Sequence, residues 1–261
     1  MADKSYKSYR QQLNILRSRG MVIGKGSQGS RVMRILECEN YYNVINGYKE
    51  LFLASKATAT ADEAYKTGTT FDEVYALYNF DRELRNIYLK YLLKLENTFK
   101  TVIAHEFSAK YGHDNYLKIE NFDNSTERNI SSSIKLIGNI QQEIARQMSK
   151  HHQVVTHYMT EHGYIPLWVL VNVLTFGKIE NFSILGIVRA ADGSYTYGTN
   201  DAYAIAIMFA LLLSKSDLND FISSMRTAFG KLQKQLHTIS AADIMSIMGY
   251  DTNWTNLVNL I

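Results

Sequence analysis

The fold of this chain is decided by residues 70–112, which read TFDEVYALYNFDRELRNIYLKYLLKLENTFKTVIAHEFSAKYG. Thr70 and Glu73 have the spacing of a capping box, in which the hydroxyl accepts an early amide hydrogen and the carboxylate reaches back to the helix start. Gly112 is a suitable helix stop. The segment predicts one helix of roughly forty residues, long enough to be the spine of a bundle.

Within this segment apolar residues recur at helical spacing, and polar residues occupy the opposite face. The apolar positions are Leu77, Phe80, Leu84, Ile87, Tyr91, Leu95, Phe99, Val102 and Phe107, and the polar ones are Asp72, Asn79, Arg82, Glu83, Asn86, Lys90 and Asn97.

Shorter helical segments are predicted on both sides of the long helix. No segment alternates with the period of a strand, and Pro166 is the only proline, so the sequence predicts an all-α bundle. The expected helices cover residues 5–19, the segment from residue 30, the segment after residues 124–125, and residues 167–174, 202–213, 218–236 and 240–249. The segment after residues 124–125 has a stripe of Ile130, Ile134, Ile137, Ile140, Ile144 and Met148. Asp201 is the expected cap of 202–213, and Gly177 the stop of 167–174.

Composition excludes several classes of protein. Of 261 residues, 46% are hydrophobic and 20% charged, so the chain can bury a core and is not disordered. The single cysteine, Cys38, excludes an internal disulfide and a cysteine-based zinc site, and we expect it to be a small buried side chain. The start of the chain lacks the apolar stretch of a signal peptide, and residues 202–213 are too short to span a bilayer. We therefore expect a protein of the bacterial cytoplasm.

Positive charge is concentrated near the N-terminus. Residues 1–50 contain nine Lys or Arg against four acidic residues, whereas the rest of the chain is slightly acidic. Cations interleaved with tyrosines suit an RNA surface, because the cations neutralise phosphates and the aromatic rings stack on bases. The alternative is an ordinary solvated helix face. The candidates are Lys4, Lys7, Arg10, Arg17, Arg19, Lys25, Arg31, Arg34, Tyr41, Tyr42, Tyr48 and Lys49.

Gly24, Gly26 and Gly29 match the spacing G-x-G-x-x-G of dinucleotide-binding loops. That interpretation requires a preceding strand and a βαβ unit, which the sequence does not predict. We expect a flexible connector instead, with Lys25 and backbone amides available to phosphate.

Several separate motifs occur in an order and spacing that resemble one known family. They are residues 16–23 (LRSRGMVI), 40–42 (NYY), 47–48 (GY), 71–85 (FDEVYALYNFDRELR), 95–100 (LENTFK), 103–107 (IAHEF) and 165–177 (IPLWVLVNVLTFG). Together they resemble the bacterial abortive-infection (Abi) family of the AbiD/AbiF type, over nearly the whole chain.

The resemblance implies a HEPN-like helical core, phage defence by growth arrest, and toxin-like ribonuclease activity. It also implies a homodimer and, in some relatives, control by a cognate small noncoding RNA. The family chemistry rests on Arg-x(4–6)-His and uses no metal or other cofactor: His moves a proton of the 2′-hydroxyl, and Arg stabilises charge on the phosphate.

This sequence departs from the family pattern at the catalytic motif. Arg189 stands where the catalytic Arg is expected, but neither Asn nor His follows it, and no His lies between His162 and His237. The segment after Gly177 is also shorter than in family members, by roughly some tens of residues. Natural loss, a deliberate inactivating deletion, or residues missing from this chain would each explain the gap. We expect the chain not to cleave RNA.

Two other pairs have a similar spacing. Arg146 and His151 fit Arg-x4-His, but about one such match is expected by chance. In an unbroken helix this step would also turn the two side chains apart. Lys100 and His105 have the spacing with Lys in place of Arg, which favours a phosphate contact or simple packing, because Lys lacks the planar guanidinium fork.

Other candidates are weaker. His151, His152, His157 and His162 lack the i, i+4 pair with a carboxylate that helical zinc sites use, so we predict no metal site. His157 and Tyr158 are expected to pack ahead of the Pro166 helix. Trp168 and Phe176 are expected in the core, with a base-stacking platform as the alternative.

We predict a basic helical lobe over residues 1–60 and a HEPN-like bundle over 61–261. The favoured function is an RNA-binding Abi protein with no membrane partner. The alternatives are a non-catalytic dimerisation or protein-interaction module, and a nucleotide-binding enzyme that uses Gly24–Gly29.

Overall fold

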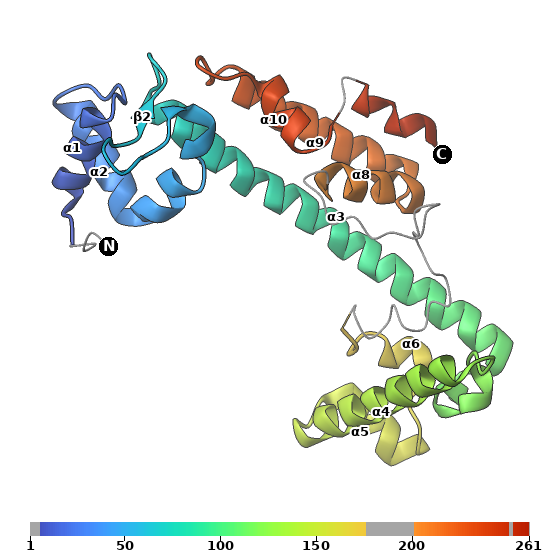
Figure 1. Ribbon diagram of the computed structural model, residues 1–261. Helices are drawn as coiled ribbons and strands as arrows, with labels where there is room; N and C mark the ends of the chain where they lie inside the picture. Colours follow the sequence, from blue (N-terminus) through green and yellow to red (C-terminus); the bar gives the residue numbers. More distant parts are fainter. Residues whose placement is uncertain (1–5, 176–200, 251–252, 261) are drawn as a thin grey trace. The chain divides into compact units, whose positions relative to one another are not determined.

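The computed structural model of the chain describes residues 6–175, 201–250 and 253–260 (Figure 1). This part is helical apart from one small sheet, which confirms the all-α prediction. The chain forms two compact units, residues 1–91 with 197–261 and residues 92–196. We call them the discontinuous unit and the central unit, and describe each by itself. The predicted boundary at residue 60 lies inside the discontinuous unit and stays a prediction.

The discontinuous unit contains helices from both ends of the sequence. Its elements are α1 (Tyr9–Ser18), α2 (Ser27–Glu39), the π-helical turn η1 (Tyr42–Asn46), η2 (Lys49–Phe52), β1 (Leu53–Ser55), β2 (Ala64–Tyr65), the first half of α3 (Phe71–Tyr111), α8 (Asp201–Leu212), α9 (Lys215–Gln233), α10 (Ala241–Ile247) and η6 (Trp254–Leu260). The central unit contains the second half of α3, η3 (Asn115–Leu117), η4 (Ile119–Asn121), α4 (Glu127–Ser149), α5 (Gln153–His162) and α6 (Leu167–Leu170).

Helix α3 confirms the prediction from residues 70–112. The amide of Glu73 donates to Thr70 Oγ1 at 3.2 Å, and Glu73 Oε2 accepts from the Thr70 amide at 3.1 Å, which completes the capping box. Gly112, in the left-handed conformation with φ +92°, follows the last turn. The predicted apolar stripe is wrong at Val102, which is exposed; in this turn of the helix Ala104 is buried instead.

Glu73 also connects α3 to a segment far along the chain. Its Oε1 accepts hydrogen bonds from the amides of His237 and Thr238, both at 2.6 Å, and from Thr238 Oγ1 at 3.1 Å. Glu73 is fully buried, and burial by itself would raise the pKa of its carboxyl. The donated hydrogen bonds outweigh burial and hold the pKa below the ordinary value of 4.5. The helix cap and the α9–α10 connection thus share one ionised group.

Aromatic side chains fill the core between α3 and the C-terminal helices. Tyr91 packs edge-on against Phe221 at a ring-centroid distance of 5.3 Å, and Phe209 lies 5.0 Å from Phe221. The Tyr88 hydroxyl donates to the carbonyl of Ala202 at 2.8 Å and hydrogen-bonds the Tyr250 hydroxyl. These contacts fix α8 and the end of the chain to the first half of α3.

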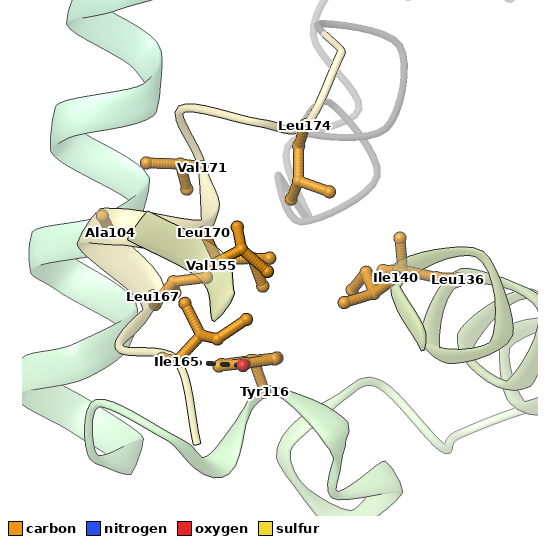
Figure 2. Close-up of a cluster of buried hydrophobic side chains, with 10 residues drawn as sticks. All are labelled: Ala104, Tyr116, Leu136, Ile140, Val155, Ile165, Leu167, Leu170, Val171 and Leu174. Atoms are coloured by element: carbon orange, nitrogen blue, oxygen red, sulfur yellow. Dashed lines mark hydrogen bonds between the residues drawn. The ribbon is translucent and has the colours of Figure 1, made fainter. Parts of the chain in front are cut away.

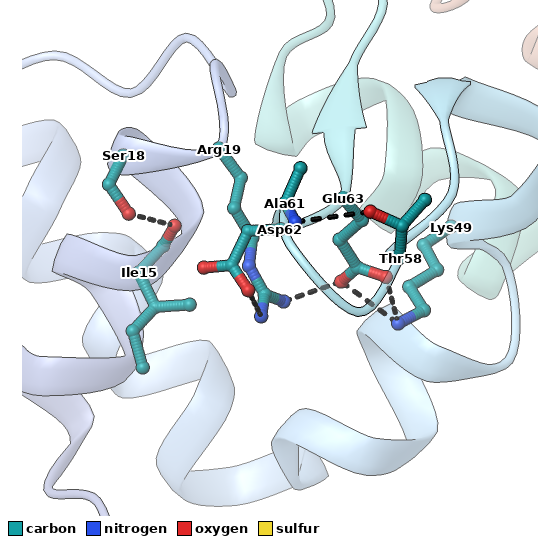
Figure 3. A network of polar contacts seen from close by, with 8 residues as sticks. All are labelled: Ile15, Ser18, Arg19, Lys49, Thr58, Ala61, Asp62 and Glu63. Atoms are coloured by element: carbon teal, nitrogen blue, oxygen red, sulfur yellow. Dashed lines mark hydrogen bonds and ion pairs between the residues drawn. The ribbon is translucent and has the colours of Figure 1, made fainter.

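A two-stranded antiparallel sheet, β1 with β2, is present although no strand was predicted. Strands of three and two residues are too short to show alternation. Beside it lies a polar network, shown in Figure 3, around the nearly buried Glu63. Arg19 Nη1 donates to Glu63 Oε1 at 2.5 Å, and Lys49 Nζ contacts Glu63 Oε2 at 2.6 Å. Two cations neutralise one buried acid, so the charge can stay inside.

The core of the central unit is formed by short segments packed on the second half of α3 (Figure 2). Tyr116 is buried among these side chains and donates its hydroxyl hydrogen to the carbonyl of Ile165 at 2.8 Å. The amide of Leu167 donates to the carbonyl of His113 at 2.8 Å. The buried set is Ala104, Tyr116, Leu136, Ile140, Val155, Ile165, Leu167, Leu170, Val171 and Leu174.

Several helix boundaries differ from prediction; α2 begins at Ser27 and not at residue 30, and α9 covers Lys215–Gln233 and not 218–236. Helix α1 begins at Tyr9 and not at residue 5, because Ser8 and Gln11 form a capping box there. Helix α6 ends at Leu170, four residues before the predicted end, and hydrogen-bonded turns continue to Leu174. The predicted stop at Gly177 lies outside the described residues, as does the side chain of Asp201. The predicted start of the last helix near residue 240 is confirmed, and Ser240 and Asp243 form a capping box there.

The predicted stripe of α4 is wrong at its first two positions. Ile130 and Ile134 are exposed, whereas Ser133, Leu136, Ile140 and Glu143 are buried. The buried face is offset from the isoleucine stripe because it includes the polar Ser133 and Glu143, and the Glu143 carboxylate is accommodated by hydrogen bonds from Arg146 and Gln147.

Cys38 is exposed, so the prediction of a buried cysteine is wrong. Helix α2 buries Gly29, Val32 and Leu36, and residue 38 follows on the opposite, solvent-facing side.

None of the helices in the described ranges combines the length and the apolar character that crossing a bilayer requires.

Glu73→Gln should lower the free energy of unfolding by about 2–3 kcal/mol, because a charged acceptor is replaced by a neutral amide with its own hydrogens facing buried donors. Denaturant unfolding of the whole chain measures this loss. Glu83→Gln is the matched control, since Glu83 on the same helix forms only an exposed ion pair with Lys231, and should cost less than about 0.5 kcal/mol. Equal losses in the two variants would contradict the anchoring role of Glu73.

The advantage of the wild type over Glu73→Gln should depend on pH. A carboxyl whose pKa is lowered by folding stabilises the folded state above its unfolded pKa, and this contribution is lost as pH falls through the folded value. Unfolding titrations should therefore show a constant difference near neutral pH and a shrinking one below 4.5. A difference that grows on acidification would show that the folded pKa is raised.

Candidate nucleic-acid interface

Several of the N-terminal cations predicted to bind RNA are engaged inside the protein. Arg17 donates from Nε to the carbonyl of Ile23 at 3.1 Å and from Nη2 to the carbonyl of Gly24 at 2.6 Å. Arg19 and Lys49 bind Glu63, and Arg31 pairs with Asp72 at 2.5 Å. Arg17, Arg19 and Lys49 thus hold the discontinuous unit together and are poorly placed to contact phosphate, whereas Arg31 is exposed and has a surface ion pair.

The three predicted tyrosines differ in environment. Tyr41 is half-buried next to Arg19, and burial raises the pKa of its phenol. Tyr48 donates its hydroxyl hydrogen to Asp81 Oδ2 at 2.7 Å, and burial together with that carboxylate raises its pKa. Only Tyr42 of the three is strongly exposed. One open ring is thus left for stacking.

The other predicted cations, Lys7, Arg10, Lys25 and Arg34, are exposed, and their side chains form no ion pair within the described part of the chain. Arg10 and Arg34 line a cavity of about 690 Å³ between α1 and α2, together with Tyr9, Ser30 and the acidic Glu37. This α1–α2 cleft is the part of the basic lobe that stays open to an anionic ligand. Lys4 lies outside the described residues.

The glycine-rich segment connects α1 to α2 and is tied down. Gln28 Oε1 accepts from the amide of Gly24 at 2.7 Å, and Gly26 precedes α2 with φ +70°. Gly29 is buried inside α2, where a Cβ would lie 3.2 Å from Arg17 Nη2. The glycines therefore serve a close helix contact, and the expected flexible connector is an ordered turn.

In the central unit, α3 and α6 enclose a groove of about 570 Å³. We call it the α3–α6 groove; its lining residues include Lys100, His105, Ser108, His113, Trp168 and Asn172. It brings together two predicted RNA-binding residues, Lys100 and His105, with an exposed tryptophan. Three of the sequence motifs, at 95–100, 103–107 and 165–177, meet here.

The polar groups of the groove are partly engaged by neighbours. Lys100 Nζ lies 2.8 Å from Glu96 Oε1, and His105 Nδ1 lies 3.1 Å from Glu106 Oε1. The side-chain amide of Asn172 donates to the carbonyl of Trp168 at 2.9 Å, which leaves its oxygen able to accept. Ser108 Oγ is buried without a partner among the described residues. The groove can thus offer a cation, imidazoles and neutral donors and acceptors.

Trp168 is 51% exposed, so the prediction of a core tryptophan is wrong, and the alternative, a base-stacking platform, stays a prediction. The neighbouring Leu167 and Leu170 are fully buried and hold α6 on the core. In so short a helix, that face leaves residue 168 outside. Phe176 lies outside the described residues.

Arg146 and His151 are separated by the end of α4. Arg146 Nε donates to both carboxylate oxygens of the buried Glu143 at 3.1 Å, and this pairing raises the pKa of the guanidinium above its ordinary value. His151 follows the helix in the left-handed conformation with φ +52°. The premise of an unbroken helix through both residues is therefore wrong. Arg146 anchors the α4 core, and the catalytic role of the pair stays a prediction.

Of the histidines 151, 152, 157 and 162, only His157 and His162 have a ring contact with each other among the described residues, with centroids 5.8 Å apart. His152 caps α5 by accepting from the amide of Val155 at 3.5 Å, whereas His157 and His162 are exposed on α5. Within the described ranges, no three His, Cys, Asp or Glu side chains gather into a metal site. Arg189, the expected catalytic residue, lies outside those ranges.

Sequence reasoning did not identify His113, Ser108 or Asn172 as groove residues. His113 follows the helix-ending Gly112, and its backbone carbonyl is fixed by Leu167. The signal available beforehand was the single polar residue, Asn172, in an otherwise apolar segment.

A family model described as "Abi-like protein" matches residues 34–240 of the chain. Neither the curated proteins nor the solved structures contain a match to it. The matched range includes every residue that lines the α3–α6 groove, whereas Arg10 of the α1–α2 cleft precedes it.

Trp168→Phe should remove most of the tryptophan emission that iodide can quench. The chain has two tryptophans, and Trp254 is only 5% exposed. In the converse variant, Trp254→Phe, the remaining emission should be fully accessible to iodide. Equal quenching of the two single-tryptophan proteins would contradict the exposed position of Trp168.

Proposed function

Because the chain belongs to the Abi-like protein family, we propose that it is an abortive-infection protein that binds RNA through the α3–α6 groove. Family membership indicates a role in phage defence by abortive infection. RNA as the ligand is the further step of the proposal.

The observation that carries the proposal is the exposed ring of Trp168 in one groove with Lys100, His105 and His113. An indole face stacks on any base, and a lysine neutralises phosphate. An exposed tryptophan is costly to leave in water, so a surface that keeps it beside cationic groups is suited to a partly apolar, anionic ligand. Single nucleotides of RNA have that character.

The α1–α2 cleft supports the same ligand class. Arg10 and Arg34 carry positive charge that the described residues do not neutralise by an ion pair, and Tyr9 is 41% exposed beside them. Arginine suits phosphate because its planar fork binds two oxygens at once.

We further propose that this chain binds RNA without cutting it. The α3–α6 groove holds imidazoles, but its lining includes no arginine among the described residues. Metal-free ribonuclease chemistry of the Arg–His type needs a guanidinium beside the reacting phosphate. Arg189 is the remaining candidate in the family position. A HEPN-like core, a homodimer and a small-RNA partner belong to the proposal on the strength of family membership alone.

Filter binding of a single-stranded RNA at increasing salt tests the proposal. Affinity should fall steeply with salt, because binding releases counterions from phosphates. Lys100→Ala should weaken binding and reduce the slope of log K against log salt by about one.

Lys135→Ala is the control, since Lys135 is an exposed lysine of the same unit on α4 and lies outside the groove. It should change both quantities less. An absence of RNA binding, or an affinity indifferent to salt, would overturn the proposed function.

A further inference from the structure

Aromatic and imidazole rings continue from the α3–α6 groove across the central unit. Successive ring centroids lie 5.8 Å apart from Trp168 to His113, 5.2 Å from His113 to Tyr164, and 6.2 Å from Tyr164 to His162. His162 lies 5.4 Å from Tyr158 and 5.8 Å from His157. We call these six residues the aromatic track.

The track is a surface feature. Trp168 and Tyr164 are 51% and 37% exposed, His157 and His162 are exposed, and His113 and Tyr158 are half-buried. Elsewhere in the same unit Tyr116 is buried, as expected of an aromatic ring that serves packing. A connected row of open rings instead suggests a ligand that interacts with ring faces.

The backbone holds the track in place. Gly163 ends α5 in the left-handed conformation with φ +75°, and the chain turns there so that Tyr164 lies next to His162. The hydrogen bond from the Leu167 amide to the His113 carbonyl ties the end of α3 to the start of α6. Rings on such fixed elements lose little freedom on binding, which favours affinity.

We propose that the aromatic track is the path of single-stranded RNA, with separate bases resting on separate rings. This inference rests on the proposed RNA-binding function and names the form of RNA that is bound. Only a single strand can present its base faces, because in a duplex they are covered by neighbouring base pairs.

The geometry favours splayed bases over one continuous stack. The centroid distances of 5.2–6.2 Å exceed the rise of about 3.4 Å between stacked bases. Neighbouring rings are also tilted by 42–86°, so no ring covers the face of the next. Each ring can therefore accept one base that has left its own stack.

Hydrogen-bond donors along the track suit a polyanionic ligand. Three of its six rings are histidines, which can donate hydrogen bonds to phosphate oxygens, and the track begins at the groove that contains Lys100. A surface that offers both ring faces for stacking and hydrogen-bond donors to phosphate matches the alternation of base and phosphate in an RNA strand.

The test compares a twelve-residue oligouridine, which has little structure of its own, with an RNA duplex of the same length, by fluorescence anisotropy on the full chain. The single strand should bind more tightly. Tyr164→Ala and Trp168→Ala should each weaken its binding about 5- to 100-fold, the range that loss of one base–aromatic contact gives.

Conservative variants separate stacking from folding. Tyr164→Phe and Trp168→Phe keep a ring face and should retain affinity within about threefold, a small part of one stacking contact. Ile134→Ala removes an exposed apolar side chain of α4 that lies outside the track and should leave binding unchanged. Thermal unfolding of every variant checks that the central unit is intact.

Oligouridine binding that Trp168→Ala weakens but Tyr164→Ala leaves unchanged, or duplex binding of equal strength, would overturn the track while leaving RNA binding by the groove in place. Binding that survives both alanine substitutions would overturn the track and the groove together. An alanine variant and its phenylalanine counterpart that lose affinity equally would also overturn the track. Failure of the wild type to bind any RNA would instead remove the proposed function on which the track rests.

Discussion

The buried carboxylate of Glu73 is the constraint on which the rest of the structure depends. It completes the cap of α3 through Thr70 and at the same time accepts hydrogen bonds from His237 and Thr238. A buried carboxylate is tolerated only when its lone pairs are satisfied, so the start of the long helix and the α9–α10 connection require each other. The discontinuous unit is built around that requirement, with aromatic packing of α8 and α9 on α3 completing its core.

The same principle explains why net charge is a poor guide to RNA contacts in this chain. Buried acidic side chains are paired with cations of the protein: Glu63 binds Arg19 and Lys49, and Glu143 binds Arg146. The N-terminal cations Arg19 and Lys49 are thereby neutralised within the protein. Fewer cations are left to bind a ligand, and those that are left lie beside exposed aromatic rings. The α3–α6 groove and the aromatic track are therefore better candidates for RNA contact than the basic segment.

A structural feature could be predicted from the sequence when the residues that determine it are close together in the chain. The capping box at Thr70, the length of α3 and the start of α10 near Ser240 were predictable, because a cap and its helix lie within a few residues of each other. Exposure of Trp168 and Ile134 was not, since burial depends on which face meets another segment. The partners of Arg19 and Glu73 lie 44 and up to 165 residues away, beyond any local pattern, and the track joins α3, α5 and α6 in the same way.

The discontinuous unit also imposes an order on synthesis. Helices α1 and α2 leave the ribosome early, yet the amide of Thr238 that Glu73 requires is translated 165 residues after it. At about 5–20 residues per second, the interval is roughly 8–30 seconds. During that time Glu73 Oε1 lacks its donors from His237 and Thr238, although the local cap with Thr70 can form. The described part of the central unit ends at residue 175 and is translated sooner. The discontinuous unit can therefore complete its fold only after residues 237 and 238 have been translated, and a chain terminated before α8 lacks that unit's core.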